Sequence, residues 1–318
     1  MLNHRMDFWN LAIRIIFLSQ ITIGILGNVS LLFFYLFLYY KESILKPTEL
    51  ILMHLMAANI IIILSAGVPQ TITIWGLKQL LNDFGCKFLL YIHAIGRSVS
   101  IFTTCLLSVF QAMTISPRKF CGKYHKVTIE KYLGCFISFL WVLYILVNLI
   151  FLVYTFIKKN SKNETRKRNF GYCSTVGSDN ISDSLYAALV MCPEVFFSVL
   201  IAWSSGSMIA ILYRHKKKVQ YIYSTRVSRR DYPESRATRN ILAQVFTFLA
   251  FYTLSSMLRG STALLPNQNL WLMNINHLTS LCFPTFGPFV LMSHYSFVSR
   301  FIFVWLRKRI CSFLNYKM

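Results

Sequence analysis

The chain has 318 residues, of which 55% are hydrophobic and only 14% are charged, whereas soluble domains carry roughly 25% charged residues. This composition excludes an ordinary soluble globule and indicates lipid as the main solvent. The formal net charge of +22 would suit a nucleic-acid-binding protein, but here the basic residues lie between long uncharged stretches. We therefore expect no nucleic-acid partner and interpret the charge as a signal of membrane topology.

Seven stretches are long enough to cross a bilayer, which needs about 20 mostly apolar residues in a helix. The predicted helices cover residues 11–40, 48–76, 84–116, 131–157, 184–213, 238–260 and 271–297. The uncharged stretch after Arg259 must break near Pro266, because as one helix it would be about 60 Å long, twice what the membrane accepts. We predict an all-α membrane protein: a seven-transmembrane-helix bundle in a single domain over residues 1–318, with a tail over 298–318.

Basic residues flank the predicted helices unevenly. Seven spans place the two termini on opposite sides, and Lys and Arg gather on the cytoplasmic side. The side that contains the carboxyl-terminal tail has 21 Lys and Arg residues, and the other side has eight. The tail is therefore expected to be cytoplasmic and the amino terminus extracellular.

Two cysteines and one sequon fall on the expected outer side. Cys86 begins the third helix and Cys173 lies in the loop after the fourth, so a disulfide between them is chemically reasonable in an oxidising compartment, and it would hold that loop over the mouth of the bundle. Asn163 opens the sequon Asn-Glu-Thr in the same loop and is the best candidate for glycosylation. Pro193 and Pro288 are expected to kink their helices, with the freed carbonyls satisfied by neighbouring groups.

Strings of residues along nearly the whole chain resemble the vomeronasal type-1 receptors. The matching strings are Ser19-Gln20, Gly24 to Asn28, His54-Leu55, Ala58-Asn59, Gly67 to Pro69, Thr103 to Ala112, Ile115 to Pro117, Trp203 to Met208, His215-Lys216, Val219-Gln220, Ser224-Thr225, Pro233 to Thr238, Phe283-Pro284 and Pro288 to Leu291. Two local departures are Gly287, where Ser is usual, and Ser228, where Pro is usual. The resemblance implies a rhodopsin-like architecture and a chemosensory G-protein-coupled receptor, not an enzyme, and implies no cofactor.

The resemblance also implies partners and a location. It implies a multi-pass receptor of the plasma membrane that binds pheromones or related small semiochemicals and activates a heterotrimeric G protein of the inhibitory type. The G protein is expected at the loops after helices three and five, although their positive charge has a second explanation in topology and anionic lipid. The candidate coupling residues are Gln111, Pro117, His215, Lys216, Pro233, Glu234 and Arg236.

Compared with the wider rhodopsin-like class, the chain lacks familiar switches. Phe110-Gln111-Ala112 stands where that class has Asp-Arg-Tyr, and helices six and seven lack the Cys-Trp-x-Pro and Asn-Pro-x-x-Tyr motifs. Asn28, Trp141 and the Cys86–Cys173 pair are shared with that class. The usual trigger mechanisms therefore cannot be transferred to this chain.

Charges at membrane depth are costly and mark candidate functional sites. Arg97 lies about 16 Å below Cys86 along its helix, and Glu194 lies about 15 Å into the fifth helix, so their depths match. They form either a structural ion pair or a pair of groups offered to a ligand. His93, Ser100 and Thr104 share one helix face with Arg97 and could line the same cavity, although polar residues on such a face can equally join helix to helix.

Three other functions compete with the receptor interpretation. A bitter-taste-type receptor shares the bundle but fits the strings in helices three and five less well. A seven-helix transporter would show repeated halves and several acids at mid-membrane, and neither occurs here. An enzyme is disfavoured because the chain has no phosphate-binding loop and no metal-ligand spacing beyond Cys121 with His125, which is half a zinc site and indicates no metal.

Overall fold

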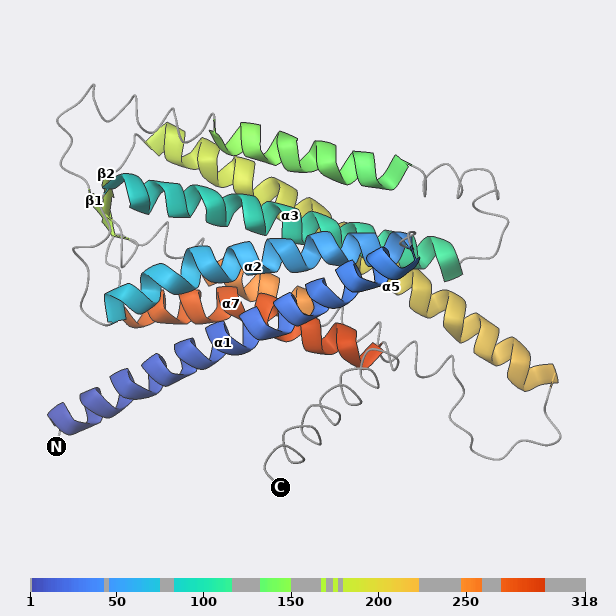
Figure 1. Cartoon of the computed structure of the whole chain (residues 1–318), viewed down its shortest axis with the longest axis horizontal. Coiled ribbons are helices and arrows are strands. Elements are labelled where there is room, and N and C mark those ends of the chain that lie inside the picture. Colours follow the sequence, from blue (N-terminus) through green and yellow to red (C-terminus); the bar gives the residue numbers. More distant parts are fainter. Residues whose placement is uncertain are drawn as a thin grey trace.

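The computed structural model describes residues 2–42, 46–74, 83–115, 132–149, 167–169, 174–176, 180–222, 247–258 and 270–294. Seven helices lie within these ranges (Figure 1). They are α1 (Leu2–Glu42), α2 (Pro47–Ile74), α3 (Asp83–Ile115), the fourth helix (Tyr132–Leu149), α5 (Asn180–Ile222), the sixth helix (Thr247–Leu258) and α7 (Leu270–His294). The predicted all-α, seven-helix membrane bundle is confirmed.

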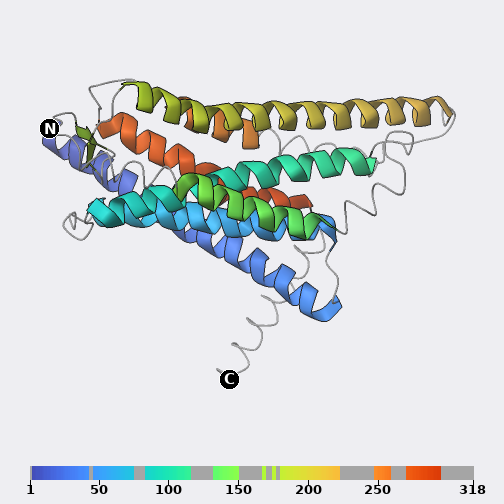
Figure 2. The same ribbon diagram turned by 90° about the horizontal axis from the view of Figure 1, so that it is seen from above.

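Several helices are longer than their apolar cores. Five of those described are long and apolar enough to span a membrane, namely Leu11–Lys41, Pro47–Ile72, Lys87–Thr114, Tyr132–Leu149 and Cys192–Ile211. α1 begins at Leu2 rather than near residue 11, and α5 continues to Ile222 rather than ending near residue 213. Figure 2 shows the end of α5 extending well beyond the other helices. Outside the hydrocarbon a helix no longer has to be apolar, so the hydropathy pattern underestimates its length.

A short hairpin adds to the predicted elements. Strands β1 (Lys167–Asn169) and β2 (Ser174–Val176) pair antiparallel, with Arg168 opposite Thr175. They lie at the end of the bundle where the amino-terminal end of α1 lies (Figure 1).

The apolar side chains divide between the interior and the outer surface of the bundle. On the fourth helix Leu133 and Ile137 are buried, whereas Phe136, Phe139 and Val142 are exposed. In water such an exposed apolar face would be a liability, but in a bilayer it faces lipid tails. The outward apolar surface is therefore part of what makes this bundle a membrane protein.

α2 and α3 form the centre of the bundle. α2 packs against α1, α3 and α7, and α3 packs against both α2 and α5. One continuous cluster of buried side chains joins these helices to the sixth. Its largest fully buried members are Leu31, Ile51, Leu52, Leu55, Met56, Ile101, Leu107, Ile137, Ile201 and Phe248.

A buried polar network ties α1, α2, α3 and α7 together. Asn28 donates hydrogen bonds from Nδ2 to the carbonyl oxygens of Gly24 at 2.7 Å and Pro284 at 2.8 Å. Its Oδ1 accepts from Asn59 at 3.1 Å, and the Oδ1 of Asn59 accepts from Ser100 at 3.1 Å. The three side chains are fully buried, and such bonds hold helices together where apolar contact gives no preference over lipid.

This network also accounts for a proline in α7. Pro288 has no N–H, so the carbonyl of Pro284, four residues earlier, loses its helical donor. The Asn28 amide supplies the missing hydrogen bond. The expectation that a neighbouring helix satisfies the carbonyl freed by Pro288 is therefore confirmed.

Glycine allows the close approach of α3 to α2. A Cβ atom built on Gly96 would lie 2.9 Å from Cγ2 of Ile61 and 3.3 Å from the carbonyl oxygen of Ala58. The first distance is shorter than real Cβ contacts, and neither a β-branched Cγ2 nor a backbone carbonyl can move away easily. In contrast, a Cβ on Gly206 of α5 would meet nothing within 4 Å.

We predict that Gly96→Ala destabilises the protein and that Gly206→Ala does not. Overpacking costs about 1–3 kcal/mol, and Ala gains up to about 1 kcal/mol over Gly in a helix. The unfolding temperature of the protein in detergent should therefore fall for Gly96→Ala and stay level or rise for Gly206→Ala. Equal unfolding temperatures for the two variants would contradict the tight α2–α3 contact.

Candidate functional site

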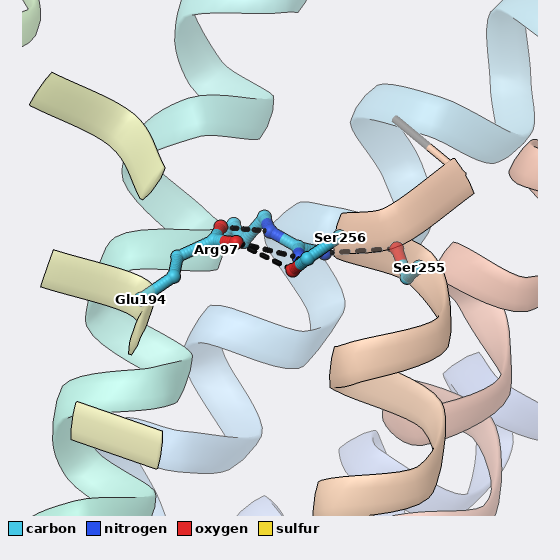
Figure 3. A network of polar contacts seen from close by, with 4 residues as sticks. All are labelled: Arg97, Glu194, Ser255 and Ser256. Atoms are coloured by element: carbon cyan, nitrogen blue, oxygen red, sulfur yellow. Dashed lines mark hydrogen bonds and ion pairs between the residues drawn. The ribbon is translucent and has the colours of Figure 1, made fainter. Parts of the chain in front are cut away.

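Two opposite charges meet in the interior of the bundle. Arg97 on α3 is 5% exposed and Glu194 on α5 is 8% exposed. The Arg97 Nε donates to Oε1 of Glu194, and Arg97 Nη2 donates to Oε2 at 3.1 Å, so the contact is bidentate. The matched depth predicted for these residues is confirmed, because the two side chains form an ion pair (Figure 3).

The sixth helix contributes two hydroxyls to this pair. Arg97 Nη1 donates to Oγ of Ser255 at 3.1 Å, and Arg97 Nη2 donates to Oγ of Ser256 at 2.7 Å. The hydroxyl of Ser256 in turn donates to Oε2 of Glu194 at 2.6 Å. Figure 3 shows the four side chains converging from three helices, α3, α5 and the sixth.

The face of the guanidinium contacts an aromatic cluster. Cζ of Arg97 lies 4.8 Å from the centroid of the Tyr252 ring, within the range of a cation–π interaction. Tyr252 stacks on Phe248 with ring centroids 4.4 Å apart, and both rings meet Phe283 of α7 at 5.0 Å. The three rings are buried. Through them the cation on α3 is in packing contact with both the sixth helix and α7.

The physical chemistry of this arrangement favours a pair over separate charges. One charged side chain at the centre of a membrane helix costs about 2.5–3.5 kcal/mol even on the lower scales. Two opposite charges with a bidentate contact and additional hydrogen bonds offset much of that cost. The arrangement holds α3, α5 and the sixth helix in one register, and displacement of any member leaves another buried and unpaired.

The other predicted residues of the α3 face turn toward α2 or toward α3 itself. His93 Nδ1 lies 3.3 Å from Oγ of Ser65, and Ser100 donates to Asn59. Thr104 donates to the carbonyl of Ser100 at 2.8 Å. The structure thus brings together Arg97 and Glu194 but not His93, Ser100 or Thr104, whose ligand contact stays a prediction.

Three residues of this site were not identified from the sequence. Tyr252, Ser255 and Ser256 are spaced at i, i+3 and i+4, so they share one face of the sixth helix. A polar face on an otherwise apolar helix was the available signal. The signal is weak because hydroxyl side chains in helices commonly bond their own backbone, as Thr253 does to the carbonyl of Leu249.

The predicted cytoplasmic residues are described only in part. Gln111 lies near the end of α3 and is partly buried, and His215 and Lys216 lie on the extension of α5, where their side chains are not described. Cys86 lies on α3, again without a described side chain. Outside the described residues lie Pro117, Asn163, Cys173, Pro233, Glu234 and Arg236.

The chain is similar to known proteins along nearly its whole length. The family described as "Vomeronasal organ pheromone receptor family" matches residues 11–311. The chain is 44% identical to vomeronasal type-1 receptor 4 of Homo sapiens over 290 residues, which cover 91% of this chain and 96% of that protein. It is 45% identical to human vomeronasal type-1 receptor 2 over 275 residues, covering 86% and 70% of the two chains.

A more distant relative extends the comparison to fish. The chain is 29% identical to "Olfactory receptor class A-like protein 1" of Danio rerio over 280 residues, covering 87% of each chain. The seven-helix bundle, the family match and these identities agree. The chain belongs to the vomeronasal type-1 receptor family of chemosensory G-protein-coupled receptors.

Proposed function

We propose that this receptor binds a pheromone or related small semiochemical beside the Arg97–Glu194 pair and activates a heterotrimeric G protein of the inhibitory type. The observation that carries the proposal is the buried pair itself, with its hydrogen bonds to Ser255 and Ser256. Strongly polar groups that converge from several helices at membrane depth are the usual chemistry of a ligand site within a bundle. Family membership supplies the class of ligand and of partner.

A ligand at this site would have a direct route to the helices that must move. It shifts a receptor between states only by binding one state more tightly than the other. The guanidinium of Arg97 contacts α5, the sixth helix and the Tyr252 ring at once. A ligand that competes for any of these contacts changes the relative free energy of two helix arrangements, and the Tyr252, Phe248 and Phe283 rings extend the effect along the sixth helix and α7.

The G protein is proposed to dock where α3 and α5 leave the membrane. Gln111 is near that end of α3, and α5 continues past its apolar core with Arg214, His215 and Lys216. The proposal adds Pro117, Pro233, Glu234 and Arg236 in the neighbouring loops by resemblance to the family. It places the receptor in the plasma membrane with its amino terminus outside and its carboxyl terminus in the cytoplasm.

Two covalent features belong to the same proposal. A disulfide between Cys86 and Cys173 would fasten the outer loop to α3, and a glycan on Asn163 would mark that loop as extracellular. β1 and β2 support the first feature, because Cys173 immediately precedes β2 in the sequence and the hairpin lies at the end of the bundle where α1 and α3 begin (Figure 1).

The double variant Arg97→Met with Glu194→Met separates ligand contact from structural pairing. Replacing a buried ion pair by apolar side chains of similar volume is often neutral, so the double variant should reach the cell surface. If the pair contacts the ligand, calcium imaging with a promiscuous G protein and a pheromone mixture should show no response. A full response by the double variant at the surface would reduce the pair to a structural role.

The single variants are the controls for this experiment. Either one leaves an uncompensated buried charge, at a cost of about 3–5 kcal/mol. We therefore expect surface delivery to fall for Arg97→Met and for Glu194→Met, and to recover in the double variant.

Coupling is tested by replacing residues 233–238 with a Gly/Ser sequence of the same length. Signalling should be abolished, because these residues belong to the proposed G-protein surface, while ligand binding and surface delivery persist. Unimpaired signalling by this variant would remove the segment from the coupling surface.

A further inference from the structure

One of the N–H groups of Arg97 has no hydrogen-bond acceptor among the described residues. A guanidinium carries five N–H donors. Nε donates to Glu194, Nη2 donates to Glu194 and Ser256, and Nη1 donates to Ser255. Among the residues that the structure describes, the second N–H of Nη1 has no acceptor. It is buried, because the whole residue is 5% exposed.

Ser255 offers a second donor at the same place. Its Oγ accepts from Nη1 of Arg97 at 3.1 Å, and its own hydroxyl proton has no acceptor within the described part of the chain. Ser255 is 1% exposed. Two adjacent donors in a buried site without an acceptor are costly to leave unmatched, so they point to an oxygen atom that is supplied from outside the chain.

The charges already present at the site determine whether a charged or a neutral ligand oxygen is preferred. The carboxylate of Glu194 already neutralises the guanidinium. In the described spans Lys87, ten residues earlier on α3 and so about 15 Å away along the helix, is the next charged residue of that helix. A ligand carboxylate or sulfate would give the group of charges a net negative charge at membrane depth, which costs free energy. A neutral carbonyl oxygen accepts both hydrogen bonds without that cost.

We infer that the site recognises an uncharged oxygen acceptor, namely the carbonyl of a ketone, ester or amide, through Arg97 Nη1 and the Ser255 hydroxyl, in preference to a carboxylate or sulfate. This inference rests on the proposed function, since it specifies the chemistry of a ligand at that same site. Glu194 selects against anions, because its carboxylate already neutralises the guanidinium of Arg97 that would otherwise attract an acidic ligand.

Matched ester and acid probes test this selection. The probes are methyl octanoate, methyl decanoate and methyl dodecanoate, each paired with the free carboxylate of the same chain, and calcium responses are recorded from the full-length receptor. The wild type should respond to an ester at a concentration lower by about tenfold or more than to its acid. In Glu194→Gln the guanidinium keeps a neutral partner and regains its free charge, so the order should reverse toward the acid.

A second variant keeps the test valid if Glu194→Gln does not reach the surface. Ser255→Ala removes one of the two donors and should raise the effective ester concentration by about tenfold, the usual loss for a buried hydrogen bond to a ligand. Thr253→Ala is the matched control on the same helix, because its hydroxyl bonds its own backbone and does not contact Arg97. The control should leave the ester response unchanged.

The possible failures differ in what they exclude. A wild-type receptor that prefers the acids overturns the inference and leaves the proposed function intact. A receptor that responds to a pheromone mixture but to neither probe set also overturns it, and then a bound water satisfies the two donors. A receptor that reaches the surface but responds neither to the mixture nor to the probes removes the proposed function itself.

Discussion

A charge buried in hydrocarbon has to be matched, and the arrangement of this receptor's interior depends on that requirement at one place. Arg97 and Glu194 neutralise each other across α3 and α5, and Ser255 and Ser256 bring the sixth helix into the same contact. In water such a pair would contribute little, because solvent screens it. In lipid the alternative to the pair is an isolated charge, so the pair holds three helices in one relative position. A ligand that competes for the contacts of the pair therefore also changes the free energy of that helix arrangement.

The second polar network stands in contrast to the first. Asn28, Asn59 and Ser100 link α1, α2, α3 and α7 with neutral groups, and the carbonyl freed by Pro288 is satisfied there. In this network the side chains of Asn28, Asn59 and Ser100 bond to one another and to the backbone of α1 and α7. α3 contributes Ser100 to this network and Arg97, one turn away, to the ion pair. α3 thus takes part both in a network that fixes the helix packing and in a site where Arg97 and Ser255 still have unused hydrogen-bond donors.

The sequence allowed the bundle and the matched depth of Arg97 and Glu194 to be predicted for a simple reason. The lipid requires apolar side chains along the whole length of each span, so the spans can be identified from hydropathy. The constant helical rise converts residue number into depth, so the depths of Arg97 and Glu194 could be compared from the sequence alone. The direction of a side chain is harder to obtain. The sequence left open whether Ser100 lines a cavity with Arg97 or joins α3 to another helix, and in the structure Ser100 donates to Asn59 of α2. Which neighbour a helix face meets depends on the rotation of α3 against α2, and hydropathy does not encode that rotation. Ser255 and Ser256 were missed because hydroxyl side chains in helices commonly bond their own backbone, so their shared helix face was a weak signal.

Exchange of the two charges measures the central contact most directly. Arg97→Glu alone, or Glu194→Arg alone, places two like charges side by side in the bundle, whereas the exchange of both restores an ion pair in reversed order. We expect surface delivery and the unfolding temperature to collapse in each single variant and to recover substantially in the exchanged receptor. Single variants that fold as well as the wild type, or an exchanged receptor no better than the worse single variant, would show that the two residues are not partners.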